Sequence, residues 1–219
     1  GKVATAHTAS DNLETMIFNL TRGTSLKGLC GIPVKRGKFI RPLILCSRLD
    51  VEDYCEQNGL SFVTDSTNLS DDYSRNKIRH NVIPVLKEIN SAAEESALRT
   101  SFGIAEDVYY LENVAKEILF RNSDDGGLSL SDLDITSPAV FKRVIKKYFE
   151  IIFPYVSLEN YHINEIYTAC IKGKGKLNLP SNLYAVIKNG YLNFEDSTEK
   201  NSVDFAVKIT EKENVNNLF

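Results

Sequence analysis

The sequence predicts an α/β fold with a parallel sheet in its first part, then a long helix, then a mainly helical second domain that contains a β-hairpin. Three observations predict this fold. A strand-like segment, two helical segments and another strand-like segment follow one another within residues 2–64, an order typical of parallel sheets. Helical periodicity then extends from about residue 74 to 120. Finally, Asn189 and Gly190 separate two alternating segments, which is a strong hairpin signal.

The first predicted strand leads directly into the first predicted helix. Residues 2–7, KVATAH, are short and partly β-branched, as expected of a buried strand. Thr8 can cap the following helix, with Asp11 completing a capping box, and the helix is expected to stop at Gly23 with Arg22 in its last turn. Four apolar residues recur along it at helical spacing: Leu13, Met16, Ile17 and Leu20.

A second helix and a second strand follow. In residues 47–59, SRLDVEDYCEQNG, Ser47 can cap a helix, Asp50 occupies the capping-box position, and Gly59 comes directly after the predicted end. Residues 60–64, LSFVT, are typical of a strand. These elements complete the strand, helix, helix, strand order of the predicted sheet domain.

The second half of the chain is predicted to be helical up to its hairpin. Pro84 is expected to kink or break the helical stretch, and an apolar stripe continues beyond it. The stripe consists of Leu98, Phe102, Ala105 and Tyr109. The turn-rich residues 122–127, NSDDGG, indicate a boundary, and helices are expected at about 138–152 and 158–171. We therefore predict two domains and an acidic helix that joins them: 1–88, 123–219 and 89–122.

The composition excludes several classes of protein. The 219 residues contain no apolar run long enough to cross a bilayer and no N-terminal signal, so we expect a cytoplasmic protein without membrane contact. A hydrophobic content of 42% is ample for packed cores. No two cysteines form a C-x-x-C pair, which argues against a zinc ribbon or a dithiol redox motif.

Positive charge is concentrated in the first part of the chain, although the formal net charge is −3. Two windows contain no acidic residue, one between Glu14 and Asp50 and the other between Asp72 and Glu88. Their basic residues are Arg22, Lys27, Lys35, Arg36, Lys38, Arg41 and Arg48, and then Arg75, Lys77, Arg79, His80 and Lys87. Such clustering is typical of a surface that binds a phosphate-bearing partner such as RNA, while a solvated charged face is the alternative.

His7, Asp11 and Glu14 form the first candidate site. On a helix that turns about 100° per residue, the three side chains would lie within about 60° of one another, opposite the apolar residues. They also follow a strand that leads into a helix, which is where open α/β sheets bind ligands. The alternative is an ordinary helix start, in which Asp11 completes the cap and Glu14 is merely exposed.

Five motifs occur in unbroken order in this part of the chain. They are H-x-x-x-D-x-x-E-T from His7 to Thr15, R-G-x-x-L-K-G-L from Arg22 to Leu29, R-P-L from Arg41 to Leu43, D-S-x-N from Asp65 to Asn68, and R-N-x-I-R from Arg75 to Arg79. Together they resemble the tRNA(Ile)-lysidine synthases, a family of PP-loop (N-type) ATP pyrophosphatases. The later helices and the hairpin resemble, more loosely, the domain that follows in that family.

The resemblance implies a domain architecture. Residues 1–88 would be the C-terminal part of a PP-loop domain with an adenine-nucleotide-hydrolase-like, Rossmann-like fold, and residues 123–219 a helical tRNA-binding domain. On this resemblance, the chain would begin after the family's S-G-G-x-D-S phosphate loop and end before its last C-terminal domain, and it has Ser10 where many members have an acid. We therefore expect this chain by itself to be inactive and to hold no cofactor firmly.

The resemblance also implies a reaction. ATP would adenylate the 2-oxygen of the wobble cytidine in a minor isoleucine tRNA and release pyrophosphate, and the ε-amine of free lysine would then displace AMP to form lysidine. The implied partners are the tRNA, L-lysine and ATP, with Mg²⁺ as the metal. The oligomeric state is left open, with a homodimer as one alternative.

The family motifs suggest a role for each polar residue. Asp11 would bind Mg²⁺ with Glu14 behind it, and the imidazole of His7 is suited to act as a general base. Arg75 and Arg79 lie at i and i+4 and could stabilise charge on the α-phosphate or hold the anticodon backbone. The residues assigned to substrate or RNA binding are Arg22, Lys27, Asp65, Asn68 and Asn76.

Each assignment has an alternative. His7 could simply form a hydrogen bond at the strand end, and Arg22 could be only a helix C-cap. Asp65, which the resemblance pairs with the cationic end of lysine, could be a turn or cap residue, as could Asn68. For the whole chain, the alternatives are a noncatalytic tRNA-binding module and another PP-loop enzyme such as a tRNA thiolase, against which the lack of paired cysteines argues.

Overall fold

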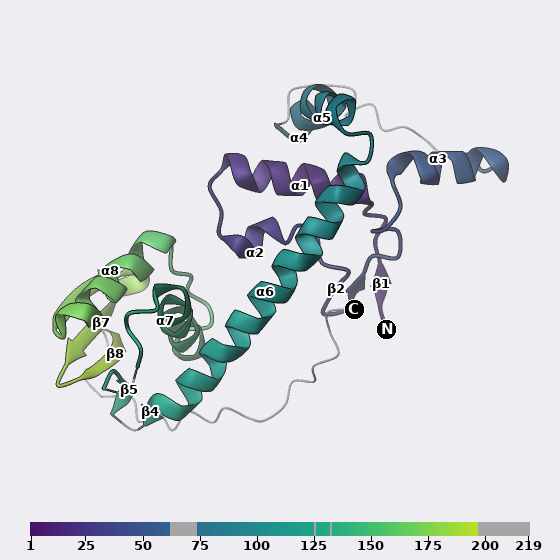
Figure 1. Ribbon diagram of the computed structural model, residues 1–219. Coiled ribbons are helices and arrows are strands. Elements are labelled where there is room, and N and C mark those ends of the chain that lie inside the picture. Colours follow the sequence, from purple (N-terminus) through teal and green to yellow (C-terminus); the bar gives the residue numbers. More distant parts are fainter. Residues whose placement is uncertain (62–73, 125, 132, 197–219) are drawn as a thin grey trace. The chain divides into compact units, whose positions relative to one another are not determined.

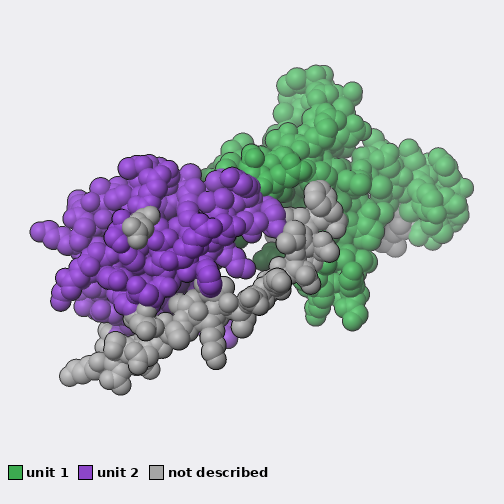
Figure 2. Space-filling view, turned by 60° about the horizontal axis from the view of Figure 1, so that its bottom comes forward, with its two compact units in different colours: residues 1–108, 212–219 green, residues 109–211 purple. Residues whose placement is uncertain are grey.

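The computed structural model describes residues 1–61, 74–124, 126–131 and 133–196 (Figure 1). These residues form two compact units, which Figure 2 shows in different colours. Unit 1 contains the described residues up to Val108, and unit 2 contains those from Tyr109 onward. No helix in the described part of the chain is both long enough and apolar enough to cross a membrane.

Unit 1 contains a small sheet in which the strand order is β1-β3-β2. Strand β1 (Val3–Ala4) pairs in parallel with β3 (Phe39–Ile40), and β2 (Lys35–Arg36) pairs with β3 in the antiparallel direction. The α/β class is confirmed, and the parallel partner of β1 is a strand that the sequence pattern did not indicate. Most of the second predicted strand, residues 60–64, lies outside the described residues.

Helix α1 (Ala9–Thr21) follows β1 and begins with the predicted capping box. The backbone N–H of Thr8 donates to Asp11 Oδ2 at 2.8 Å, and the Thr8 hydroxyl accepts from the backbone N–H of Asp11. His7 therefore precedes the helix instead of belonging to it, so the shared helical face expected for His7, Asp11 and Glu14 is wrong for the histidine.

The C-terminal end of α1 is also close to the prediction. Arg22 is the C-cap, and Gly23 follows with a φ of 70°, a left-handed conformation that favours glycine. The predicted apolar stripe is only partly right, because Leu13 is buried whereas Leu20 is 65% exposed.

Two further helices of unit 1 follow in the chain. The single-turn helix α2 (Leu26–Leu29) was not predicted, whereas α3 (Arg48–Gln57) begins with the predicted capping box. Its cap residue Ser47 donates its backbone N–H to Asp50 at 2.7 Å and accepts the Asp50 N–H at its hydroxyl. Hydrogen bonds from the hydroxyl and from the backbone N–H of Ser47 lower the pKa of the Asp50 carboxyl.

Three consecutive helical segments complete this side of unit 1. They are α4 (Ser74–Lys77), a π-helical turn η2 (Ile78–Val82) and α5 (Ile83–Ile89). Both α4 and η2 pack on α1, where Leu13, Ile78 and Ile83 form a small core with Phe18 at its side. The break predicted at Pro84 is confirmed, because this residue lies in the first turn of α5, where a missing N–H breaks no helical hydrogen bond.

Helix α6 (Ala93–Asn122) is a single helix that contributes to both units. In unit 1 it buries Leu98 and Ser101, whereas Phe102, a member of the predicted stripe, is 37% exposed. The units divide between Val108 and Tyr109. The ranges 1–88, 89–122 and 123–219 were expected from the sequence, and they stay a prediction about which parts fold independently.

Unit 2 is a five-stranded antiparallel sheet of order β4-β5-β8-β7-β6 with two helices. The helices α7 (Pro138–Ile152) and α8 (Asn160–Lys172) lie close to the predicted ranges. The predicted hairpin is confirmed: Asn189 and Gly190, both with positive φ, connect β7 (Leu183–Lys188) to β8 (Tyr191–Asp196). The remaining strands are β4 (Ser123–Asp124), β5 (Gly127–Ser129) and β6 (Gly175–Leu179).

The core of unit 2 corrects two expectations. Residues 122–127, which were expected only as a turn-rich boundary, include β4 and the start of β5, and these strands pair with each other while β5 also pairs with β8. The unit also has a sheet larger than the single hairpin expected, which packs with both helices around Phe141, Phe149 and Ile166. Strands β5 and β6 are short, and their sequences alone do not indicate that they pair with the hairpin strands β8 and β7.

Candidate functional site

The candidate site lies where the first strand of unit 1 leads into its first helix. Strand β1 ends at Ala4, and α1 begins at Ala9, so Asp11 and Glu14 occupy the first two turns of the helix. Because β1 runs parallel to β3, this is the carboxyl end of a parallel strand pair. The first turns of a helix also favour negative charge, since unpaired backbone N–H groups point toward it.

Arg79 joins the two acidic residues from a distant part of the chain. Its Nε donates to Glu14 Oε1 at 2.6 Å, and its Nη2 donates to Glu14 Oε2 at 2.9 Å. The Glu14 side chain is only 5% exposed, against 24% for Arg79. The hydrogen bond to Glu14 raises the pKa of the Arg79 guanidinium. The alternative interpretation, an ordinary helix start, is therefore right about the capping role of Asp11 and wrong about an exposed Glu14.

Asp11 lies beside this pair, and its two carboxylate oxygens have different neighbours. Its Oδ2 accepts from the backbone N–H and the hydroxyl of Thr8, at 2.8 Å and 3.0 Å. Its Oδ1 lies 3.6 Å from Nη2 of Arg79, and the side chain is 32% exposed. One oxygen of Asp11 thus completes the helix cap, while the other is at the surface next to a guanidinium.

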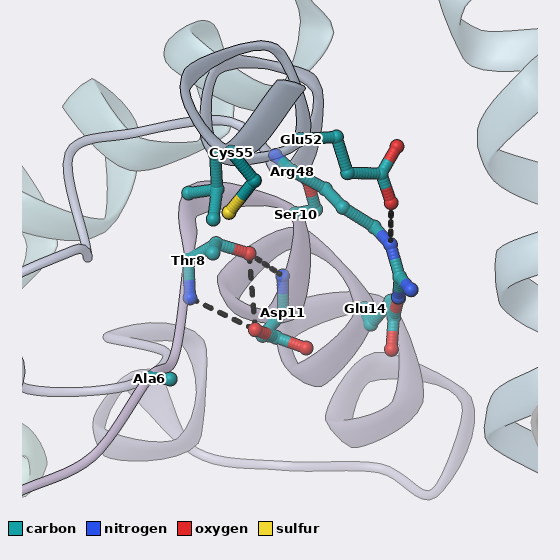
Figure 3. Close-up of a pocket in the computed structure, with 9 residues that line it drawn as sticks. Ala6, Thr8, Ser10, Asp11, Glu14, Arg48, Glu52 and Cys55 are labelled. Atoms are coloured by element: carbon teal, nitrogen blue, oxygen red, sulfur yellow. Dashed lines mark hydrogen bonds and ion pairs between the residues drawn. The ribbon is translucent and has the colours of Figure 1, made fainter. Parts of the chain in front are cut away.

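A cavity of about 240 Å³ opens beside Asp11 and Glu14 (Figure 3). The N-terminal turns of α1 form one wall and α3 forms the other, with Arg48, Glu52 and Cys55 on the α3 side. Arg48 Nε donates to Glu52 Oε1 at 2.9 Å, so the charges on that wall are paired. The other acidic residues of the lining are Asp11 and Glu14, and Glu14 is itself paired with Arg79.

The carboxylates fit a metal site only in part. In the described ranges there is no group of three or more His, Cys, Asp or Glu side chains arranged to hold a metal ion. Both Glu14 oxygens are engaged by Arg79, whereas Oδ1 of Asp11 accepts no hydrogen bond from another described side chain. Mg²⁺ commonly binds through one or two carboxylates and completes its shell with water and substrate phosphates, so Asp11 alone would suit it.

The other predicted site residues of unit 1 that the structure describes are not among those that line the cavity. The Nδ1 atom of His7 lies 3.0 Å from the hydroxyl of Thr5, and this residue is not among those that line the cavity. Asn76 is buried in α4 and Lys27 is exposed in α2. The two residues of the D-S-x-N motif, Asp65 and Asn68, lie outside the described residues.

Arg75 and Arg22, which the sequence assigned to different tasks, meet at one aromatic ring. The guanidinium carbon of Arg22 lies 5.2 Å from the centre of the Phe18 ring, and that of Arg75 lies 5.7 Å from it. Arg75 therefore does not join Arg79 at Glu14, although the two arginines are only four residues apart.

Sequence reasoning missed Asn12, which is fully buried between the predicted site residues. Its Oδ1 accepts from the backbone N–H of Ile32 at 2.7 Å, and its Nδ2 donates to the hydroxyl of Ser101 at 3.3 Å. A side-chain carbon at Gly31, where φ is 64°, would overlap with Asn12 Oδ1. The one available signal was a polar residue on the apolar side of α1, which predicts a buried hydrogen-bonded group.

Ser10 was noted only because relatives often have an acid there. It is buried, and its hydroxyl accepts from the backbone N–H of Arg48 at 3.1 Å. This hydrogen bond gives a partner to a backbone N–H in the first turn of α3, and it connects α3 to α1, the two walls of the cavity. A carboxylate could accept the same hydrogen bond, which gives a physical reason for either residue type at this position.

Comparisons with known proteins identify the relatives of this chain. Residues 2–86 match a family model that describes the PP-loop domain. The tRNA(Ile)-lysidine synthase of Geobacillus kaustophilus is 35% identical over 199 residues, which is 85% of this chain and 43% of that protein. The enzyme of the same name from Clostridium perfringens is 36% identical over 196 residues, covering 86% of this chain and 42% of the relative.

A third relative extends the comparison to another group of bacteria. The tRNA(Ile)-lysidine synthase of Bacteroides thetaiotaomicron is 40% identical over 140 residues, or 64% of this chain and 33% of that protein. The chain thus spans less than half the length of these curated relatives. The resemblance indicated by the five sequence motifs is confirmed.

Proposed function

Because residues 2–86 belong to the PP-loop domain family, we propose that this chain acts in the ATP-dependent ligation of lysine to the wobble cytidine of a minor isoleucine tRNA. The product is lysidine, and the side products are AMP and pyrophosphate. The names of the relatives support this activity, and ATP use is supported by the family of the domain.

The observation that carries the proposal is the cluster of Asp11, Glu14 and Arg79. It combines the first and last of the five motifs, and it lies beside a cavity at the carboxyl end of a parallel strand. Two carboxylates and a guanidinium supply what nucleotidyl transfer needs: an attachment point for a metal ion and a cation that can face developing negative charge.

The first step is adenylation of the base. The 2-oxygen of the cytidine attacks the α-phosphorus of ATP, a new O–P bond forms, and the bond to the bridging oxygen breaks with release of pyrophosphate. Asp11 Oδ1 would hold a Mg²⁺ ion, which would supply positive charge beside the phosphates, since the other oxygen of Asp11 is held by the helix cap. Arg79 lies 3.6 Å from Asp11, where a guanidinium can stabilise an α-phosphate oxygen.

The second step forms the carbon–nitrogen bond. The neutral ε-amine of lysine attacks the activated C2 of the cytidine, the C2–O bond breaks, and AMP leaves with that oxygen. A base must take one proton from the amine nitrogen, and we assign this task to His7. Its Nδ1 faces the Thr5 hydroxyl at 3.0 Å, which would leave Nε2 as the nitrogen that accepts the proton.

Glu14 receives a different role from the one suggested by its motif. With both oxygens bound to Arg79 and little exposure, it positions the guanidinium and does not contact the metal. Asp11 would therefore act at the phosphates, while Glu14 would hold Arg79. This assignment predicts that Glu14→Gln lowers activity through Arg79, without changing the Mg²⁺ concentration that gives half-maximal activity.

The experiment is a lysine-incorporation assay on the full-length gene product, with isoleucine tRNA, ATP and radiolabelled lysine. We expect label in the tRNA only when ATP and Mg²⁺ are present, and one pyrophosphate released for each lysine incorporated. Incorporation of sulfur instead of lysine would support a thiolase. Tight tRNA binding with no pyrophosphate release in any condition would support the noncatalytic RNA-binding module and contradict the proposal.

A further inference from the structure

Two arginine side chains from different helices lie over the aromatic ring of Phe18. Arg22 extends from the C-cap of α1 and Arg75 from α4, and their guanidinium carbons lie 5.2 Å and 5.7 Å from the centre of the ring. Both arginines are exposed. In the described ranges no carboxylate lies within ion-pair distance of either. Phe18 itself is anchored, because it packs against the core formed by Leu13, Ile78 and Ile83.

Two like charges at one ring repel each other, so the arrangement costs free energy in the absence of a ligand. The ring compensates in part, because each guanidinium gains roughly 0.5–1 kcal/mol from an aromatic face at an exposed site. An anion in contact with both guanidinium groups would offset the repulsion between them, because each group attracts it. Each guanidinium presents a planar fork of donors, which matches the oxygens of a phosphate.

The two arginines and the candidate active site lie along the same face of α1. Asp11, Glu14, Phe18 and Arg22 recur on α1 at intervals of three or four residues, so they share one face of the helix. The rise of 1.5 Å per residue places Arg22 about 16 Å along the axis from Asp11. The same face meets Arg79 near its start and Arg75 farther along, so a strand of RNA lying on it would pass from one site to the other.

We propose that Arg22 and Arg75, held on Phe18, form a binding site for a backbone phosphate of the RNA substrate, one or more nucleotides away from the base that reacts. The proposal rests on the proposed function only for the identity of the RNA. Phosphate contacts position a nucleic acid without reading its sequence, so this site would set where the strand lies relative to Asp11. The phosphates of ATP are the other source of the same chemistry.

The test measures binding of an isoleucine tRNA transcript to the whole chain by filter binding across a salt series. Arg22→Ala and Arg75→Ala should each weaken binding and reduce the slope of log affinity against log salt by about 0.7 to 0.9 for each phosphate that is no longer neutralised. The double variant should reduce the slope by about the amount expected for one phosphate, because both arginines contact the same phosphate. Arg99→Ala is the matched control, because Arg99 is an exposed arginine of unit 1 whose Nη2 donates to Ser96.

Two further variants separate the charge from the geometry. Arg22→Lys with Arg75→Lys keeps both charges, so it should retain most of the salt slope while losing part of the affinity, since an ammonium cannot form two parallel hydrogen bonds. Phe18→Leu keeps apolar volume in the core but removes the aromatic face. It should weaken tRNA binding with little change in thermal stability, because both arginines lose the surface that orients them.

Titration with ATP and Mg²⁺ distinguishes the two sources of phosphate. An ATP affinity that falls in the arginine variants while the tRNA salt slope stays unchanged would overturn the proposal. An unchanged slope in the double variant, or no measurable binding of tRNA by the whole chain, would also overturn it. If the slopes fall as expected and the full-length product forms no lysidine, the phosphate site stands and the proposed ligase function fails.

Discussion

Arg79 binds both carboxylate oxygens of Glu14, at 2.6 Å and 2.9 Å, although the two residues are separated by 65 positions in the sequence. The guanidinium comes from the π-helical turn η2. Arg75, on the preceding α4, lies over Phe18 instead, whereas Arg79 reaches Glu14. This one ion pair connects the first motif of the chain to the last.

Replacement of Arg79 should destabilise unit 1. Arg79→Ala leaves the carboxylate of Glu14 buried without its cation, and we expect a loss of about 3 kcal/mol, the lower end of the range for a broken buried pair. Arg79→Lys should cost less, because it keeps the charge but not the two parallel hydrogen bonds. Urea unfolding followed by circular dichroism measures both values.

A double-mutant cycle isolates the contribution of the pair itself. When Glu14→Gln is combined with Arg79→Ala, the total loss should be clearly smaller than the sum of the two single losses, since neither charge is then left alone. The control is Arg121→Ala, whose partner Glu117 lies 3.6 Å away in a pair that is well exposed on both sides. That change should cost no more than about 1 kcal/mol. Additive losses in the cycle would contradict the coupling.

Asp11→Asn should separate chemistry from RNA binding. An amide keeps the shape and can still cap α1, so stability and tRNA affinity should change little. The loss of charge removes the proposed metal contact, and we expect pyrophosphate release by the full-length product to fall to background. Asp53→Asn, an exposed acid on α3, is the control and should leave the rate unchanged. Full lysidine formation by Asp11→Asn would show that Asp11 has only its capping role.

Asn12→Ala should be among the most destabilising polar substitutions in unit 1. Asn12 is fully buried, and its removal leaves the N–H of Ile32 and the hydroxyl of Ser101 without this partner. We expect a loss of roughly 1–3 kcal/mol in the free energy of unfolding. Asn113→Ala, at an exposed position of α6, should stay within about 0.5 kcal/mol of the unsubstituted chain. Equal effects of the two changes in urea unfolding would contradict this role of Asn12.

The stability of unit 2 should fall at alkaline pH. Burial raises the pKa of Tyr148 to about 12, and that of Cys170 also to about 12. Below the unfolded pKa of each group, both states hold the proton and stability does not depend on it. Above about pH 8.5 for the thiol and pH 10 for the phenol, the unfolded chain releases a proton that the folded unit retains, so stability falls until pH reaches about 12.

Tyr148→Phe should remove only the part of this fall that begins near pH 10. That part amounts to at most about 2.7 kcal/mol for a difference of two pH units in pKa. Urea unfolding at pH 9, 10 and 11 measures it, with Tyr184→Phe on strand β7 as the control that should follow the unsubstituted curve. A Tyr148→Phe curve that stays parallel to the control between pH 10 and 11 would contradict the assignment.

Short-range patterns predicted the local features of this structure well. Both capping boxes, Thr8 with Asp11 and Ser47 with Asp50, form as expected, because each depends on atoms only three residues apart. The turn at Asn189 and Gly190 also depends on two residues with positive φ, and it sets the register of its own hairpin. The family motifs added the expectation that Asp11, Glu14 and Arg79 belong to one site.

What the sequence by itself determined was therefore the capped starts of α1 and α3 and the turn of the hairpin, while its set of site residues stays a prediction. Only the tertiary structure decided which of them meet: Arg79 binds Glu14, Arg75 lies on Phe18, and His7 precedes the helix it was expected to join. Periodicity identifies the residues that share a face of a helix but carries no information about the element that covers that face. The burial of Glu14 depends on η2 packing against α1, a contact between segments that the chain brings together only when it folds.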